Sequence, residues 1–230
     1  MKLKTLLLIV MCLFGSFAVS CQEQTKISIL GDSYTTYRGY VYPEYNACWY
    51  GTPQKTTEQK KNDLTSVEQT WWRLLVDKMD AKLIRNNSYS GATICFTGYD
   101  KEDYSDRSFI SRMFNLGDPD IILIMGGTND DWADSPVGEC QYENWTREDL
   151  YKFRPAFCYL LHHMKLLYPN ARIYNVSNCD LGETVTQSMA DICQHYGIPN
   201  IQLEKVQKMG GHPSVNGMQM IADQIYERIK

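Results

Sequence analysis

The most constraining feature of the sequence is residues 121–125, Ile-Ile-Leu-Ile-Met, where every side chain is apolar. A turn at Asp118-Pro119 precedes this run, and two glycines follow it. A strand that is apolar at every position has to be covered on both faces, which is typical of the centre of a parallel sheet. The run therefore predicts an α/β protein with helices on both faces of its sheet.

The rest of the chain alternates between short β-rich runs and longer segments with helical spacing of apolar residues. We expect strands at residues 26–30, 81–85, 121–125, 171–176 and 200–203. We expect helices at residues 66–80, 107–116, 157–168, 184–196 and 214–229. Such alternation implies a parallel sheet with right-handed crossovers. In these sheets, ligands bind beyond the carboxyl ends of the strands.

The N-terminus is typical of a bacterial secretory signal. Residues 1–20 have a basic start followed by a short apolar run. Small residues directly before Cys21 are similar to the lipobox of bacterial lipoproteins, although Ala18 stands where Leu is usual. We therefore expect export to the periplasm or cell surface and a lipid anchor on Cys21, with ordinary signal cleavage as the alternative. Residues 26–230 are expected to form one domain.

The charge of the chain excludes nucleic acid as a partner. Removal of residues 1–20, which carry Lys2, Lys4 and no acid, changes the formal net charge from −4 to −6. Nucleic-acid affinity depends on cationic side chains that neutralise phosphates, and no basic cluster is present. The expected partner is a small-molecule or polysaccharide ester, for reasons given below.

Six cysteines remain besides Cys12 in the signal and the anchor candidate Cys21. An even number in an oxidising compartment permits up to three disulfides, and buried free thiols are the alternative. No CxxC pair occurs, which argues against a structural zinc site. We also expect no other metal and no organic cofactor. The six are Cys48, Cys95, Cys140, Cys158, Cys179 and Cys193.

Polar, glycine-containing segments follow three of the predicted strands, and a fourth precedes the last predicted helix. Because the carboxyl ends of parallel strands share one edge of the sheet, these segments are expected to meet there. They are Gly31-Asp32-Ser33-Tyr34, Ser90-Gly91, Gly126-Gly127-Thr128-Asn129-Asp130 and Gly210-Gly211-His212-Pro213.

Taken together and in this order, the four segments resemble the blocks of the SGNH, or GDSL, hydrolases. Tyr34 replaces the usual Leu of the first block. One block alone is a weak signal, because Gly-Asp-Ser arises often by chance, whereas four in order span nearly the whole predicted domain. The resemblance implies a three-layer α/β/α sandwich of the flavodoxin-like type, with five parallel strands in the order 2-1-3-4-5.

The resemblance also implies a serine esterase that works through an acyl-enzyme. Ser33 is the expected nucleophile and His212 its general base, since a serine hydroxyl needs a neighbouring group to take its proton. The developing oxyanion would be held by the backbone N–H groups of Ser33 and Gly91 and by the side-chain amide of Asn129. Glycine at position 91 lets the backbone approach the substrate without a Cβ in the way.

One position departs from the family pattern. The last block of the family reads Asp-x-x-His, and Met209 occupies the place of that Asp. An orienting carboxylate can be worth about 10⁴ in rate in a related triad. Three readings remain: a backbone carbonyl orients His212, an acid from elsewhere does so (Asp180, with Glu183 behind it), or the protein has lost catalysis and binds glycans.

The substrate is suggested by an aromatic segment after the first strand. Tyr and Trp side chains suit sugar rings as well as acyl chains, although these residues would equally well pack the loop onto the domain. We expect a carbohydrate O-acetylesterase, with a lysophospholipase or thioesterase, or an inactive glycan-binding lipoprotein, as alternatives. The aromatic residues are Tyr34, Tyr37, Tyr40, Tyr42, Tyr45, Trp49, Tyr50 and, after the third block, Trp132.

Overall fold

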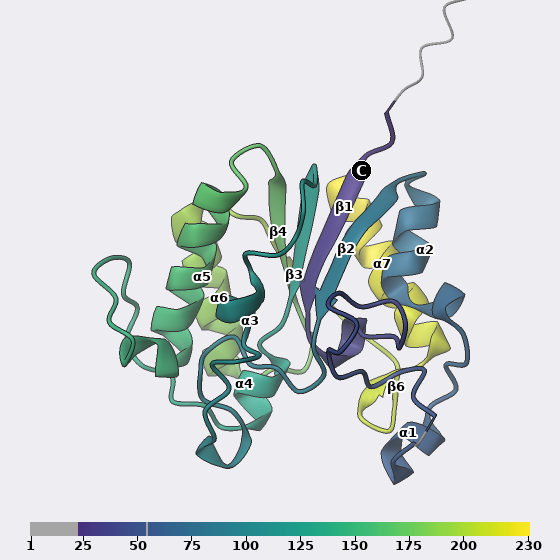
Figure 1. Ribbon diagram of the computed structural model, residues 1–230, viewed down its shortest axis with the longest axis horizontal. Helices are drawn as coiled ribbons and strands as arrows, with labels where there is room; N and C mark the ends of the chain where they lie inside the picture. The colour runs from purple at the N-terminus through teal and green to yellow at the C-terminus, as the bar shows by residue number, and fades with distance from the viewer. Residues whose placement is uncertain (1–22, 54) are drawn as a thin grey trace, which may run out of the picture.

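A computed structural model describes residues 23–53 and 55–230 (Figure 1). The predicted signal and Cys21 lie outside these residues, so the prediction of a lipid anchor stays a prediction. Within the described ranges, no helix combines the length and the apolar character needed to cross a membrane.

The core of the fold is a five-stranded sheet whose neighbouring strands all pair in parallel, in the order β2-β1-β3-β4-β5. This confirms the predicted fold class and strand order. The apolar run is the central strand, with β1 and β4 as its neighbours. The strands are β1 (Lys26–Gly31), β2 (Lys82–Ser88), β3 (Ile121–Met125), β4 (Arg172–Ser177) and β5 (Asn200–Gln202).

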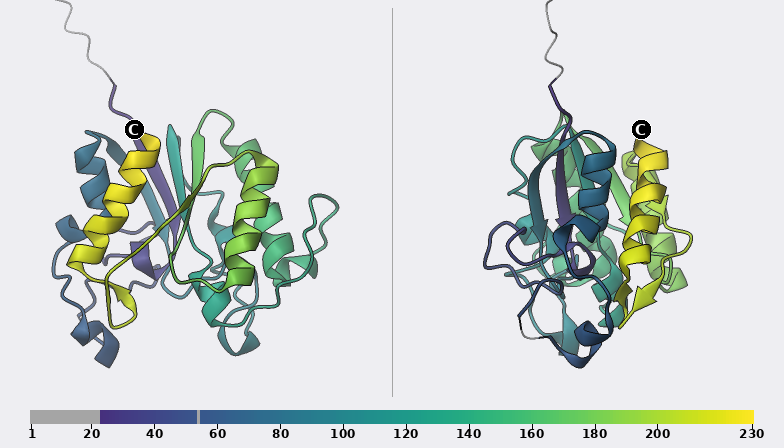
Figure 2. Two further views of the ribbon diagram at one scale, coloured as in Figure 1. Left: turned by 180° about the vertical axis from the view of Figure 1, so that it is seen from behind. Right: turned by 90° about the vertical axis from the view of Figure 1, so that its right-hand side faces the viewer.

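Two layers of helices cover the sheet, α2 and α7 on one face and α3, α5 and α6 on the other (Figures 1 and 2). The alternating side chains of β3 explain why both faces need cover. Ile122 and Ile124 pack under α3, α5 and α6, whereas Ile121 and Leu123 pack under α2 and α7. All four side chains are fully buried. The helices named are α2 (Trp71–Lys78), α3 (Phe109–Arg112), α5 (Phe153–Leu167), α6 (Glu183–Tyr196) and α7 (Val215–Ile229).

Local signals set several helix ends, and tertiary contacts moved others. Ser214 caps α7 through the backbone N–H of Gly217, and Gly197 ends α6 with a φ of 64°. The predicted helix over residues 66–80 is wrong in its first turn. Thr70 is extended and separates a 3₁₀ turn at Val67–Gln69 from α2.

The second strand is longer than predicted because its end pairs with β1. Gly31 lies opposite Ser88 on one side and opposite Met125 on the other. The segments that follow β1, β2 and β3 therefore begin at the same level of the sheet.

None of the six cysteines in the described chain forms a disulfide. Cys95, Cys158 and Cys193 are buried, which agrees with the reading as free thiols.

Candidate active site

The nucleophile candidate Ser33 begins a 3₁₀ turn, Ser33–Thr35, directly after β1. The carboxylate of Asp32 accepts the backbone N–H of Tyr34 at 3.0 Å and caps this turn. Ser33 is 4% exposed. The strand end and its cap thus fix the backbone position of Ser33.

His212 lies on a hairpin that sequence analysis did not predict. Strands β6 (Lys208–Met209) and β7 (His212–Pro213) pair antiparallel around Gly210 and Gly211, whose φ values are 61° and 76°. Two left-handed residues in a row are the requirement of a tight hairpin turn, which explains both glycines. A Cβ on Gly210 would also come within 2.2 Å of a backbone oxygen.

Two tyrosines attach this hairpin to the rest of the site. The hydroxyl of Tyr34 donates to the carbonyl of Gly211 at 3.1 Å, and that of Tyr50 donates to the carbonyl of Pro213 at 2.9 Å. Tyr34 directly follows Ser33, so the same short segment carries the candidate nucleophile and holds the loop of the candidate base, His212.

The structure brings the two residues together, with 2.8 Å between His212 Nε2 and Ser33 Oγ. The pKa of His212 is lowered to about 4, chiefly by burial and to a lesser extent by the charge of Lys208, whereas the carbonyl of Gly210 acts in the opposite direction. The imidazole is therefore neutral near pH 7, and its Nε2 is available to take the serine proton.

A backbone carbonyl, and neither of the two candidate carboxylates, lies at the other ring nitrogen. His212 Nδ1 is 3.4 Å from the carbonyl oxygen of Gly210. Asp180 is bound instead to the ammonium of Lys208. Glu183 is exposed in the first turn of α6. This arrangement matches the first of the three readings of Met209, a Ser–His dyad whose imidazole is oriented by the backbone.

Aromatic rings surround the imidazole. Trp49 stacks on His212 with 3.8 Å between ring centroids and 8° between planes, and Trp132 meets it edge-on at 6.2 Å. The aromatic segment after β1 therefore reaches the site only in part. Tyr40 and Tyr45 of the same segment are 52% and 86% exposed, and Tyr40 packs against Tyr37 and Trp72.

The second and third blocks contact each other beyond the carboxyl ends of the strands. Gly91 has a φ of 83°, and no atom lies within 4 Å of the place where a Cβ would be. Asn129 lies in a short helix, α4 (Thr128–Trp132), that sequence analysis missed. Its Nδ2 donates to the carbonyl of Ala92 at 3.0 Å, and its Oδ1 accepts the hydroxyl of Tyr99 at 2.8 Å. The carbonyl bond places the Asn129 amide next to the residue that follows Gly91.

Two buried aspartates hold the backbone around the site. Asp130 accepts the backbone N–H groups of Ile94 at 2.8 Å and Cys95 at 3.1 Å, which ties α4 to the segment after Gly91. Burial raises the pKa of Asp130 to about 6 and that of Asp32 to about 7. Their hydrogen bonds are to nearby backbone N–H groups, which is the role of structural aspartates.

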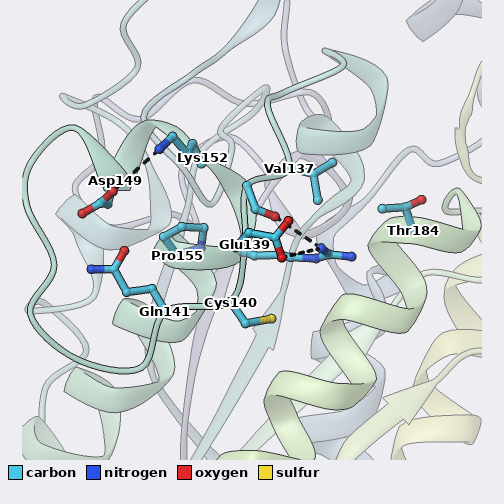
Figure 3. A pocket seen from close by; sticks show the side chains of 10 residues that line it. Val137, Glu139, Cys140, Gln141, Asp149, Lys152, Pro155 and Thr184 are labelled. Atoms are coloured by element: carbon cyan, nitrogen blue, oxygen red, sulfur yellow. Dashed lines mark hydrogen bonds and ion pairs between the residues drawn. The ribbon is translucent and has the colours of Figure 1, made fainter.

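A cavity of about 740 Å³ lies away from this site, between the segment after α4 and the start of α6 (Figure 3). Glu139, Asp149, Lys152 and Arg154 line it, so its charges cancel. No Ser33, Gly91, Asn129 or His212 atom contributes to its wall. In the described part of the chain, no group of three or more His, Cys, Asp and Glu side chains is arranged to hold a metal ion.

Comparison with known proteins points to the same family that the four sequence segments resemble. Residues 25–229 match the family described as GDSL-like lipase/acylhydrolase. A crystal structure of a GDSL-like protein from Bacteroides uniformis is 59% identical, with a TM-score of 0.88 over 90% of this chain and 96% of that one. A second, from Bacteroides ovatus, is 51% identical, with a TM-score of 0.86 over 90% and 99%.

More distant structures share the fold alone. An acetyl xylan esterase from Butyrivibrio proteoclasticus is 16% identical, with a TM-score of 0.59 over 90% of this chain and 64% of that one. Among curated proteins, no match was found.

Proposed function

Because the chain belongs to the GDSL-like lipase/acylhydrolase family over residues 25–229, we propose that it is a serine esterase in which Ser33 and His212 form the catalytic dyad. The observation that carries this proposal is the 2.8 Å contact between His212 Nε2 and Ser33 Oγ. A nucleophile within hydrogen-bond reach of a neutral base is the requirement for acyl transfer through a covalent intermediate.

In the first half of the reaction, Ser33 Oγ bonds to the ester carbonyl carbon while its proton passes to His212 Nε2. The tetrahedral intermediate then breaks its bond to the leaving oxygen, which takes the proton from Nε2 and departs as an alcohol. In the second half, water gives a proton to Nε2 and attacks the acyl carbon. The second tetrahedral intermediate then breaks the bond between the acyl carbon and Ser33 Oγ, which takes the proton from Nε2, and the carboxylic acid leaves.

The oxyanion of both tetrahedral intermediates needs fixed donors. The backbone N–H groups of Ser33 and Gly91 and the amide of Asn129 are the candidates. Asn129 uses one amide N–H on the carbonyl of Ala92, and the other has no acceptor among the described residues. Loss of one such donor typically costs about 10²–10³ in rate.

His212 does this work without a carboxylate partner. The imidazolium that forms during each proton transfer is supported at Nδ1 by the carbonyl of Gly210 and on its face by the stacked ring of Trp49. An aromatic face attracts a cation, so the stack favours the charged form when it appears in the transition state.

For the substrate, we propose an O-acetylated carbohydrate. Trp132 is 45% exposed and Trp49 is partly exposed beside the dyad, and flat rings with polar edges suit a sugar on the leaving-alcohol side. The shared fold with carbohydrate esterases supports the same choice. Export through residues 1–20 and a lipid anchor on Cys21 would bring such an enzyme to extracellular polysaccharides.

The test is hydrolysis of p-nitrophenyl esters and of acetylated xylo-oligosaccharides by residues 23–230, beside the Ser33→Ala variant. We expect acetyl ester hydrolysis that falls by at least about 10³ in the variant. Higher rates on long acyl chains than on acetyl would instead favour a lysophospholipase or thioesterase. Binding of acetylated oligosaccharide with equal inactivity of both proteins would refute the enzyme and leave a glycan-binding protein.

A further inference from the structure

Tyr99 contacts the candidate oxyanion hole, and no sequence motif around Tyr99 predicts this contact. It lies on the loop between β2 and α3, thirty residues from Asn129. Its hydroxyl donates to Asn129 Oδ1 at 2.8 Å. Burial raises the pKa of Tyr99 to about 12, and the charge of Asp32 adds to this, so the phenol keeps its proton at working pH.

The two hydrogen bonds of Asn129 together permit only one orientation of its amide. The carbonyl of Ala92 can only accept, so it requires the NH₂ group on its side. The phenol of Tyr99 faces the oxygen and has to donate to it. A carboxamide held at both ends cannot flip, and its remaining N–H keeps a fixed direction.

The loop that carries Tyr99 is held in an unfavourable backbone conformation. Asp100 and Lys101 are consecutive non-glycine residues with φ values of 54° and 61°. L-residues rarely adopt this region, and such conformations persist only where surrounding contacts enforce them. An antiparallel bridge between Thr97 and Asp103 closes the loop around them.

The same loop also binds the C-terminal end of α4. Lys101 Nζ donates to the carbonyl oxygens of Ala133 and Asp134 and lies 3.6 Å from the Asp134 carboxylate. A cation is favourable at a helix C-terminus, where carbonyl groups lack partners. The loop therefore fixes α4 at Asn129 through Tyr99 and at its end through Lys101.

We propose that Tyr99 is a positioning residue for the oxyanion hole: it holds the Asn129 amide in the orientation that aims its free N–H at the substrate oxyanion. The inference rests on the proposed esterase function. Among the described residues, the Tyr99 hydroxyl is hydrogen-bonded to Asn129 and to neither Ser33 nor His212, so it acts through Asn129. A donor that is oriented beforehand stabilises the transition state more than one that has to be ordered during the reaction.

The experiment is a double-mutant cycle of Tyr99→Phe and Asn129→Ala, with acetyl ester hydrolysis as the readout. Phenylalanine keeps the ring and removes only the hydroxyl. We expect Tyr99→Phe to lower kcat about 5- to 20-fold with KM within about 2-fold, as for a neutral hydrogen bond felt mainly in the transition state. In the Asn129→Ala background, the same change should cost less than about 2-fold.

Tyr151→Phe is the matched control. Its hydroxyl donates to Asp103 of the same loop at 2.8 Å but has no contact with Asn129. We expect its kcat to equal that of wild type. A structural readout accompanies the kinetics: the side-chain amide protons of Asn129 should exchange with solvent faster in Tyr99→Phe, with a melting temperature close to that of wild type.

The outcomes separate the two proposals. A wild type without Ser33-dependent hydrolysis refutes the esterase and the role of Tyr99 with it. An active wild type with Tyr99→Phe at the same kcat refutes Tyr99 alone. Equal losses from Tyr99→Phe in both backgrounds, or an equal loss in Tyr151→Phe, would show a general effect of the loop and overturn the inference.

Discussion

Replacement of Asp180 by Asn tests whether a carboxylate or a backbone carbonyl orients His212. Asp180 was the carboxylate that sequence analysis put forward for this role, and in the structure it binds Lys208 instead. The change to Asn keeps the size of the side chain and removes its charge. If the dyad is oriented by the carbonyl of Gly210, catalysis should survive.

The expected size follows from the exposure of the Asp180 carboxylate, which lets water screen its ion pair with Lys208. The Asp180 side chain is 53% exposed. An exposed ion pair contributes about 0–1 kcal/mol, which corresponds to at most about a fivefold effect. Without its partner, Lys208 exerts more of its charge on His212, and the pKa of the imidazole should fall slightly further. An orienting carboxylate would instead cost about 10⁴ in kcat.

The assay is kcat and kcat/KM for p-nitrophenyl acetate across pH, with a thermal melt of each protein. Asp223→Asn is the matched control, because it breaks another exposed ion pair, Lys78–Asp223 at 2.7 Å, at a distance from the dyad. Glu183→Gln tests the second acid. We expect all three variants to retain activity within about fivefold of wild type.

A loss of more than about 10³ in Asp180→Asn alone, with an unchanged melting temperature, would contradict this reasoning. It would mean that Asp180 leaves Lys208 and reaches His212 Nδ1 when substrate binds.

Two further predictions concern the base and the second block. Because the dyad needs a neutral imidazole and burial lowers the pKa of His212 to about 4, kcat/KM for an uncharged ester should stay level as pH falls and decline only near pH 4. A decline near pH 6.5 in the pH–rate profile would show an unperturbed histidine. Gly91→Ala should cost about 1–2 kcal/mol in the free energy of unfolding from its φ of 83°. No protein atom lies near the new methyl group, so it would not clash with the protein itself. A fall in kcat/KM beyond about tenfold would therefore mean that the methyl group occupies space that the substrate needs. Unchanged kinetics would place Gly91 outside the oxyanion hole.

Local pattern was sufficient for the elements that are apolar on a regular period. Residues 121–125 predicted a strand covered on both faces, and the glycines and polar residues at strand ends predicted that Ser33, Gly91 and Asn129 would lie at one edge of the sheet. These features depend on neighbours in sequence, so the sequence carries them directly.

Short elements were missed where tertiary contacts form them. The β6–β7 hairpin has two residues per strand, and α4 has five residues. Neither has enough residues to show a period. The glycine pair at 210–211 was the available signal for the hairpin, since consecutive glycines mark tight turns.

The sequence by itself determined the fold class, the strand order through family resemblance, and the choice of Ser33 and His212 as candidates, which the structure brings to 2.8 Å of each other. The partner of His212 Nδ1, the stack of Trp49 on the imidazole and the bond from Tyr99 to Asn129 were decided only by the tertiary structure. Each of these contacts either joins two segments that are far apart in the sequence or involves a backbone group. Neither kind of contact produces a periodic pattern in the sequence. The sequence gives the chemistry of each side chain. The packing of the loops at the end of the sheet decides which of these side chains come into contact.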